Sequence, residues 1–335
     1  MNLRYLTESY IPATILFRDK QIEEIKKAID VYKKHGKGKN LLIRGTSGAG
    51  KTATLQYICQ QYNGFIKYAS GVECDNWMGI IKSLSGLNFK YGDILIKKFL
   101  EQLNQDPKAL IIDEISRVVE FKHLMQKLNL IYRRTQIPII VASNNVHFIE
   151  SLENDVKLTL FFQPIEFQPY EINELREILN KRLELCEVEI PEETKNLIIG
   201  ISKRENSARI LLELAYYCLS NDDFDIASVH QYADKYKDAD YKKIINNLGL
   251  SEKIMLRVII DSYENKINMN STLIKKECDM VDLKISKGRI SQILNDFEYE
   301  YFLITSQRLN LGRGKGMVRN IFLEDNIYKS LKGLI

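Results

Sequence analysis

Residues 45–52 read Gly45-Thr46-Ser47-Gly48-Ala49-Gly50-Lys51-Thr52. They follow the apolar run 41–43 and precede a helical pattern that starts at residue 53. A glycine-rich turn between a strand and a helix, closed by Lys and Thr, is typical of a P-loop, in which backbone N–H groups face phosphate oxygens. We expect Lys51 to reach the β- and γ-phosphates and Thr52 to offer its hydroxyl to Mg²⁺. The complete motif predicts ATP or GTP as ligand and disfavours a glycine turn without one.

The chain has 335 residues, so two or three domains are expected. Its formal net charge of +4 does not by itself demand an anionic partner, so any nucleic-acid argument must be local. The five cysteines are widely spaced and form no C-x-x-C, which predicts reduced thiols rather than a zinc site or disulfides. No apolar run reaches the ~18 residues of a membrane span, and the N-terminus lacks the apolar stretch of a signal peptide. We therefore expect a cytoplasmic protein without a membrane partner.

Apolar runs typical of buried strands recur through the first half of the chain and alternate with helical patterns. They lie at 41–43, 65–68, 109–112, 138–142 and, more weakly, 158–162. This alternation predicts an α/β fold with a parallel sheet covered by helices on both faces.

The strand signal stops after residue 170, and residues 171 to about 235 show helical patterns alone. Residues 232–250, rich in Lys and Asp, suggest a linker. Beyond it come further helical patterns and two short strands, 302–305 and 318–323, around a loop of glycine and basic residues. The predicted domains are a nucleotide-binding core at 1–168, a helical lid at 169–240 and a third domain at 241–335.

Polar side chains follow two of the predicted strands. Asp113 and Glu114 end the run 109–112, and after a P-loop we expect Asp113 to hold Mg²⁺ and Glu114 to polarise the attacking water. Asn144 and Asn145 follow the next run, and we favour Asn144 as the amide that orients the water or touches the γ-phosphate. The alternatives are two solvated acids and an ordinary turn asparagine.

Arg209 lies at the start of a predicted helix of the lid. An arginine that reaches from a lid onto the γ-phosphate would couple the nucleotide state to the angle between domains. A surface salt bridge is the alternative. We expect Glu114, Asn144 and Arg209 to be the catalytic residues.

The third domain carries a pattern typical of a winged helix. Residues 286–294 predict a helix with an apolar face and an opposite face of small, polar and basic residues, and a basic hairpin follows at 308–319. Such a helix can enter the major groove of duplex DNA, and a glycine-rich hairpin tip can approach the backbone closely. The expected apolar face comprises Ile290, Ile293, Leu294 and Phe297. The expected DNA contacts are Lys287, Arg289, Ser291, Gln292, Arg308, Arg313, Lys315 and Arg319. A winged helix that binds protein is the alternative.

The ordered set of motifs resembles the archaeal origin-recognition initiators, AAA+ proteins related to the eukaryotic origin recognition complex and its loading factor. Gly45–Thr52 and Ile111–Glu114 are similar to the family's Walker A and Walker B motifs, Ala142–Phe148 to its sensor 1, and Ser207–Arg209 to its sensor 2. Residues 10–22 resemble the segment that lies against the adenine, residues 165–170 the start of the lid, and residues 289–295 and 312–319 the recognition helix and wing. The resemblance implies ATP or ADP with Mg²⁺ as cofactors, the metal at Thr52 and Asp113. The implied nucleotide contacts are Ile11, Arg18, Gly45, Thr46, Ser47, Gly48, Ala49, Gly50, Lys51, Thr52, Ala53, Tyr170, Ile178 and Arg209.

The chain departs from the family pattern at several positions. Asp155 stands where the family usually has an arginine that acts in trans as a finger, and a carboxylate cannot stabilise developing phosphate charge. Ser116 stands where the family often has a second acid. The stretch 117–134, where the family inserts a DNA-gripping helix, is compact, so that Arg117, Lys122 and Lys127 are weak candidates for DNA contact.

These expectations describe a slow ATPase that uses hydrolysis as a switch. It would bind duplex DNA at a replication origin under control of ATP and help to recruit a replicative helicase, with sister initiators as further partners. Two alternatives stay open. One is a transcription regulator on the same scaffold, which binds promoters; the other is a signalling ATPase whose winged helix binds protein.

Overall fold

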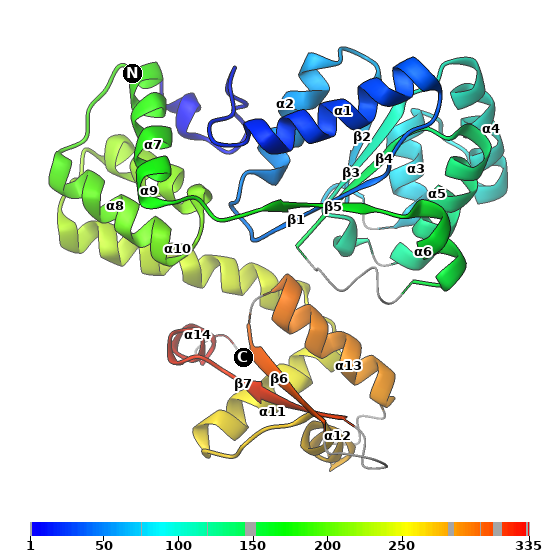
Figure 1. Cartoon of the computed structure of the whole chain (residues 1–335). Helices are drawn as coiled ribbons and strands as arrows, with labels where there is room; N and C mark the ends of the chain where they lie inside the picture. The colour runs from blue at the N-terminus through cyan, green and yellow to red at the C-terminus, as the bar shows by residue number, and fades with distance from the viewer. Residues whose placement is uncertain are drawn as a thin grey trace. The chain divides into compact units, whose positions relative to one another are not determined.

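The computed structural model describes residues 2–74, 76–118, 120–144, 152–280, 285–301, 303–310, 317–332 and 334, without the side chains of 237–240, 243, 299, 300, 308–310, 317 and 326. The chain forms two compact units, Met1–Val229 and His230–Ile335 (Figure 1). In this part of the chain, no helix combines the length and the apolar character that a bilayer crossing requires.

A five-stranded parallel sheet forms the centre of the larger unit, with the strand order β2-β3-β4-β1-β5. The strands are β1 (Leu41–Gly45), β2 (Ile66–Ser70), β3 (Ala109–Asp113), β4 (Ile139–Ser143) and β5 (Gln163–Phe167). Every residue of β3 and β4 is buried, as expected of a parallel sheet covered on both faces. The predicted α/β architecture is confirmed.

Helices cover both faces of the sheet (Figure 1). Alternate residues of each strand point to opposite faces, so Ile111 packs in a cluster with α1 and α2, and Ile112 packs in a cluster with α3 to α6. The helices are α1 (Asp19–His35), α2 (Lys51–Gln61), α3 (Trp77–Ser85), α4 (Gly92–Gln105), α5 (Phe121–Thr135) and α6 (Asn154–Leu160). Two short 3-10 segments, η1 (Leu3–Leu6) and η2 (Ile115–Arg117), complete this part of the unit.

The weak strand expected at 158–162 is wrong. Residues up to Leu160 belong to α6, in which Val156 and Leu160 are buried at a spacing of four while Leu158 is 78% exposed. A spacing of four is helical, whereas a strand would have buried Leu158 together with Leu160. The fifth strand starts three residues later, at Gln163, which pairs with Leu41.

Helices alone follow the sheet, as predicted. They are α7 (Ile172–Cys186), α8 (Glu192–Arg204), α9 (Ala208–Asn221) and α10 (Ile226–Asn247). The first begins with a capping box, in which the backbone N–H of Glu171 donates to Glu174 Oε2 at 2.8 Å. The linker expected at 232–250 is wrong, because α10 continues through it to Asn247 and its apolar residues Val229, Ala233 and Ile245 are buried. The described charged residues Asp234, Lys235 and Lys242 are exposed on this helix rather than marking a loop.

The smaller unit contains helices followed by an antiparallel hairpin. Its elements are α11 (Leu250–Glu264), α12 (Ser271–Met280), α13 (Lys287–Asn295), a π-helical turn η4 (Asp296–Glu300), β6 (Thr305–Asn310), β7 (Met317–Phe322) and α14 (Asp325–Leu331). Ile290, Ile293, Leu294 and Phe297 are all buried in one apolar cluster, as expected for the inner face of the helix. The hairpin pairs Thr305 with Phe322. Its second strand lies close to the predicted 318–323, whereas the first begins at Thr305, where the predicted strand 302–305 was expected to end.

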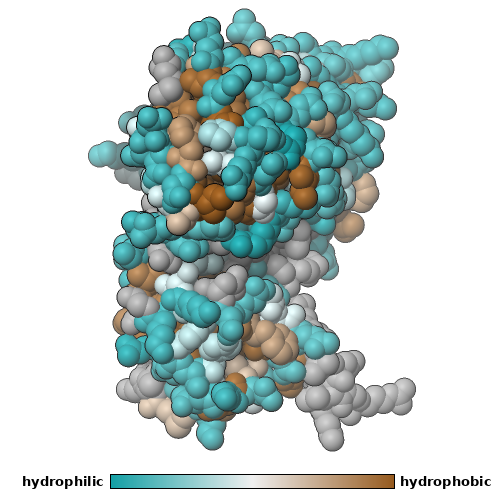
Figure 2. All heavy atoms as spheres, turned by 90° about the vertical axis from the view of Figure 1, so that its left-hand side faces the viewer, coloured by the Kyte–Doolittle hydropathy of each residue, from teal (hydrophilic) through white to brown (hydrophobic). Residues whose placement is uncertain are grey.

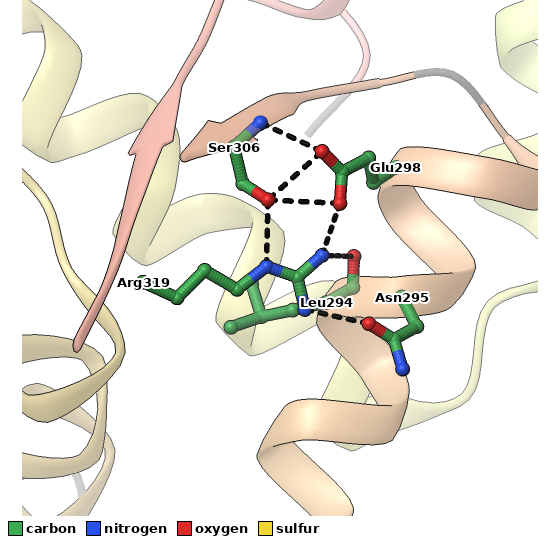
Figure 3. A network of polar contacts seen from close by, with 5 residues as sticks. All are labelled: Leu294, Asn295, Glu298, Ser306 and Arg319. Atoms are coloured by element: carbon green, nitrogen blue, oxygen red, sulfur yellow. Dashed lines mark hydrogen bonds and ion pairs between the residues drawn. The ribbon is translucent and has the colours of Figure 1, made fainter. Parts of the chain in front are cut away.

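The predicted DNA contact at Arg319 is corrected by the structure. Arg319 is 7% exposed and its guanidinium is enclosed by a network of polar contacts (Figure 3). It donates to Ser306 Oγ at 2.7 Å, to Asn295 Oδ1 at 2.7 Å and to the carbonyl of Leu294 at 3.1 Å, and it forms an ion pair with Glu298. Glu298 also accepts from the backbone N–H of Ser306 at 2.8 Å. The arginine therefore joins the hairpin to α13 and η4 instead of facing an external phosphate.

This buried pair predicts an asymmetric response to mutation. Arg319→Ala would leave Glu298 buried without its cation, and we expect it to lower the unfolding free energy of the smaller unit by about 3–5 kcal/mol. Replacing both partners, as in Arg319→Met with Glu298→Leu, should cost far less, because no uncompensated charge remains. Since the single tryptophan, Trp77, lies in the larger unit, amide hydrogen exchange of β6 and β7 is the suitable measurement. The exposed Lys329→Ala is the control, with an expected change under ~0.5 kcal/mol.

Candidate functional site

Parallel pairing brings the polar ends of three strands to one edge of the sheet. β1 pairs with β4 so that Ile43 lies beside Ala142, and β4 pairs with β3 so that Val141 lies beside Ile112. The residues just beyond these pairs are those of the P-loop, the acids at 113–114 and Asn144. Carboxyl ends of neighbouring strands are where ligands bind in open α/β sheets.

The P-loop is shaped by glycines that tolerate both unusual backbone angles and close neighbours. Gly48 and Gly50 have φ of +77° and +86°. A Cβ at Gly48 would lie 2.8 Å from Ser207 Cα, and one at Gly50 would lie 2.4 Å from the Tyr170 hydroxyl. Helix α2 begins directly afterwards at Lys51, so its N-terminal N–H groups face the loop.

Lys51 is held within the loop that precedes it. Its Nζ donates to the carbonyls of Gly45 and Thr46 at 2.7 and 2.8 Å, and its side chain is 7% exposed. Burial lowers the pKa of Lys51 to about 8, against the opposing attraction of Asp113 and Glu114. The ammonium, held against the carbonyls of the loop, is placed to contact an anion bound there, as expected of a P-loop lysine.

Asp113 and Thr52 form a group of oxygens suited to a hard divalent cation. The buried Asp113 carboxylate accepts a hydrogen bond from Thr52, and it also accepts from Glu114 N at 2.9 Å and from the Tyr68 hydroxyl at 3.2 Å. Burial raises the pKa of Asp113. A nearby cation would favour its charged form, and carboxylate and hydroxyl oxygens are ligands that Mg²⁺ accepts, so these residues fit the expected metal.

The two candidate catalytic groups beside Asp113 differ in their partners. Glu114 has a left-handed backbone, φ +47°, and its Oε2 lies 2.5 Å from Arg117 Nε. Asn144 Oδ1 is buried and has no hydrogen-bond partner among the described residues. A buried acceptor of this kind normally has a partner, so Asn144 is suited to a ligand or to a water held by one.

A pocket of about 390 Å³ opens between the P-loop, the segment 7–16 and the helices α7 and α9. Of the residues predicted to bind or act on nucleotide, it is lined by Ser47, Gly48, Gly50, Lys51, Thr52, Ala53, Glu114, Asn144, Tyr170, Ile178 and Arg209. Ile11 and Arg18 do not line it, nor do Gly45, Thr46, Ala49 and Asp113. The side of the larger unit with α7 is mainly hydrophilic, with apolar areas among the polar side chains (Figure 2).

Arg18 does not line the pocket but contacts residues that do. It is 4% exposed and donates to the carbonyls of Ala49 at 3.0 Å and Gln168 at 2.8 Å. Its guanidinium carbon lies 3.7 Å from the ring centroid of Tyr170, which does line the pocket. Burial lowers the pKa of Arg18, and the stacking and carbonyl contacts hold the cation in place. Arg18 thus fixes the P-loop and Tyr170 to each other.

Sequence reasoning missed Glu8, the turn that carries it, and Arg182 on α7. Arg182 donates to the carbonyl of Tyr5 at 2.8 Å and stacks over Tyr10, and Arg209 Nε lies 2.6 Å from Glu8 Oε1. Arg182 lies four residues after Ile178 and could have been found from the helical period of α7. Glu8 carries no such signal, because the segment around it has no regular period.

Two departures from the family pattern have local partners. Asp155 pairs with Arg133 at 2.5 Å and accepts from Asn129 at 3.3 Å, so it is part of the contact between α5 and α6. Of the weak DNA candidates, Arg117 is paired with Glu114, and Lys127 lies 3.7 Å from Asp93 and over the Trp77 ring. Lys122 is exposed.

The smaller unit presents four of the predicted DNA contacts together. Lys287, Arg289, Ser291 and Gln292 are all exposed on α13. Arg289 is engaged on this face, because its Nη2 lies 2.9 Å from Glu252 Oε1. The side chain of Arg308 and the residues Arg313 and Lys315 lie outside the described part of the chain.

Comparison with known proteins gives relatives over nearly the whole chain. An ORC1-type DNA replication protein of Thermoplasma volcanium is 24% identical over 367 residues, which cover 96% of this chain and 89% of that protein. The Orc1 protein of Aeropyrum pernix, solved in complex with DNA, matches with a TM-score of 0.69 at 18% identity, over 99% of this chain and 96% of that one. The Orc2 protein of the same organism, solved as ADPNP–ADP complexes, matches with a TM-score of 0.63 at 16% identity, over 99% and 97%. No protein-family model matches the chain.

These similarities confirm the resemblance to archaeal origin-recognition initiators. The match in fold also agrees with the α/β architecture and its parallel sheet.

The burial of Lys51 predicts a pH dependence of stability. The folded chain releases this proton near pH 8, whereas an exposed lysine keeps it to about 10.5. Between these values the unfolded chain binds more protons, so the destabilisation by Lys51 is full below pH 8 and is relieved as the pH rises. Relative to Lys51→Met, the parent should gain roughly 1–3 kcal/mol of unfolding free energy between pH 8 and 10, at up to about 1.4 kcal/mol per unit. Urea unfolding of both proteins at each pH measures this, and a constant difference would contradict it.

Proposed function

We propose that the chain is a replication initiator that binds duplex DNA at an origin under control of ATP. The observation that carries the proposal is the pocket at the end of the sheet, which is lined by the buried Lys51, the acid Glu114 and the lid arginine Arg209. The relatives named as DNA replication proteins, and the solved complex of a structural neighbour with DNA, support this assignment.

The nucleotide would bind with its phosphates along the P-loop. Backbone N–H groups at the start of α2 and the ammonium of Lys51 would hold the β- and γ-phosphates. Thr52 and Asp113 would hold Mg²⁺, which neutralises phosphate charge when bound. Tyr170 and Ile178, which line the same pocket, would contact the base, and Arg18 would keep Tyr170 in position.

Hydrolysis would be slow because the expected base is engaged. Glu114 must accept a proton from water, and the guanidinium of Arg117, 2.5 Å from Glu114 Oε2, would compete with the water for that oxygen. Asn144 would orient the water. Asp155 offers no positive charge in trans, so the chain would keep ATP for long periods and act as a switch.

The lid is tied directly to the phosphate loop. The backbone N–H of Ala208 donates to the carbonyl of Gly48 at 3.2 Å, which places Arg209 one residue further along α9. A γ-phosphate that attracts Arg209 would therefore pull on the first turn of a lid helix. We propose the domains 1–168, 169–240 and 241–335 as core, lid and winged helix; the core and the lid up to Val229 form the larger compact unit.

DNA binding would belong to the smaller unit. Helix α13 presents Lys287, Arg289, Ser291 and Gln292 outward while its other face is buried, and an antiparallel hairpin follows it. This order of helices and hairpin supports a winged helix with α13 as recognition helix. Arg308, Arg313 and Lys315 would add phosphate contacts from the hairpin. Helicase recruitment and contacts with sister initiators complete the proposal, and a chromosomal target implies a cytoplasmic location.

A transcription regulator on the same scaffold is the second candidate. Asp155, held by Arg133, favours it, because a regulator at a promoter does not need an assembly with arginine fingers. A genome-wide map of binding sites separates the two, since an initiator would concentrate at origins and a regulator at many promoters. A signalling ATPase would show little DNA binding at any salt concentration.

The nucleotide site is tested by Lys51→Ala. Removing the ammonium that would clamp the β- and γ-phosphates should weaken ATP and ADP binding at least ~10-fold, or about 1.4 kcal/mol. Titration calorimetry gives both affinities. Unchanged affinities for ATP and ADP would contradict the assignment of residues 45–52 as a P-loop.

The DNA site is tested by Glu252→Gln, which should free Arg289. Glutamine can keep the helix cap, in which Gly249 N donates to the Glu252 carboxylate at 2.6 Å, while the ion pair to Arg289 is lost. Duplex DNA should bind more tightly, and the slope of log K against log salt should steepen by about 0.9 if Arg289 gains a phosphate. Glu264→Gln is the matched control, because it removes the same charge in the same unit from a pair with Lys332. Equal effects of the two variants would show that net charge alone acts.

A further inference from the structure

An ion pair between Glu8 and Arg209 lies at the rim of the candidate nucleotide pocket. Glu8 Oε1 is 2.6 Å from Arg209 Nε, and both residues line the pocket that also contains Lys51 and Thr52. The two side chains are 50% and 42% exposed, so the pair is accessible from the pocket and from solvent. The guanidinium of Arg209, which we expect to contact the γ-phosphate, is therefore already paired with the carboxylate of Glu8.

The turn that carries Glu8 is fixed on both sides. Before it, the carbonyl of Tyr5 accepts from Arg182 at 2.8 Å, and after it, the Tyr10 ring lies under the same guanidinium at 4.8 Å. The rings of Tyr5 and Tyr10 also pack edge to face, with centroids 4.9 Å apart. The position of the Glu8 carboxylate is thus set by the fold of the segment rather than by a freely moving terminus.

Arg209 is fixed next to the phosphate loop by its neighbours. Ala208 N is bonded to the Gly48 carbonyl at 3.2 Å, and Ser207 packs against Gly48. The positive charge of Arg209 also contributes to the lowered pKa of Lys51, which indicates that the two cations are near each other. One anion between them would interact with both.

We propose that Glu8 sets the preference of this pocket between ATP and ADP, because its carboxylate competes with the γ-phosphate for Arg209. The inference rests on the proposed function and deepens it. ADP has no γ-phosphate and leaves the Glu8–Arg209 pair intact. ATP must break or share the pair, and its γ-phosphate is also repelled by the Glu8 charge. The penalty therefore falls on the triphosphate alone.

The competition also gives the N-terminal segment a role as a reporter of nucleotide state. When a γ-phosphate takes Arg209, the turn at 7–10 loses its ion pair with α9 and keeps its contact with Arg182 on α7. Residues 3–10 should consequently exchange their amide hydrogens faster with ATP bound than with ADP bound. The segment would then expose a different surface in the two states.

Glu8→Gln tests the proposal in the full chain, by calorimetric titration with ADP and with a non-hydrolysable ATP analogue. The variant loses one exposed ion pair and the repulsion between the Glu8 carboxylate and the γ-phosphate. The affinity for the ATP analogue should therefore rise roughly two- to fivefold, and the affinity for ADP should stay unchanged. Glu184→Gln is the matched control, because Glu184 lies at the same rim but pairs with Lys181 at 2.8 Å. It should leave the ratio of the two affinities at the parent value. A ratio that does not move in Glu8→Gln, or that moves equally in both variants, would overturn the proposal.

Two further measurements separate this inference from the proposed function. In an Arg209→Ala background, Glu8→Gln should change the ratio less than it does in the parent, because the competed group is gone. Hydrogen exchange of residues 3–10 should rise with the ATP analogue in the parent, and equal exchange with both nucleotides would count against the switch. If Lys51→Ala abolishes binding while Glu8→Gln has no effect, the nucleotide site stands and the role of Glu8 fails. If Lys51→Ala binds normally, both fail.

Discussion

The register of the parallel sheet is the constraint on which the candidate site depends. The pairs Ile43–Ala142 and Ile112–Val141 bring the P-loop, the acid pair and Asn144 to one edge. A slip of one residue would turn the buried Ile111 and Ile112 onto the wrong faces, and both apolar clusters would be lost. The apolar pattern that specifies the core therefore also specifies where the polar residues meet, and no separate interaction is needed to assemble them.

One contact between the lid and this edge is made by the backbone itself. Ala208 donates to Gly48, and the absence of a side chain at Gly48 lets Ser207 approach it. Such a contact leaves little room for adjustment, because both partners are main chain. Longer and more adaptable contacts surround it, among them Arg18 on Tyr170 and Arg182 on Tyr10. Rigid positioning at the phosphate loop is thus combined with cation–aromatic packing at the periphery.

The sequence was sufficient for features that depend on local pattern. The P-loop, the acids after β3 and the apolar face of α13 follow from periodicity and motif spacing, and the structure places them accordingly. The misread arginines and the missed acid have a common cause, which is that each residue's partner lies far away in the chain. The sequence alone suggested that Arg319 and Arg289 were unpaired and available to DNA, whereas the structure pairs them with Glu298 and Glu252. Glu8 gave no sequence signal, because its significance depends on the contact with Arg209. Leu158 was misread because one exposed leucine within α6 imitates a short apolar strand.

The pair between Asp155 and Arg133 limits which residues the two positions can accept. Arg133 lies 2.5 Å from the Asp155 carboxylate, which also accepts from Asn129 at 3.3 Å. Substitution of Asp155 by arginine alone would set two guanidinium groups side by side and leave Arg133 without its acid. An arginine at position 155 is therefore compatible with this contact only after Arg133 has changed, so the order of the two substitutions matters. Two positions that stand 22 residues apart in the chain thus constrain each other through a single ion pair.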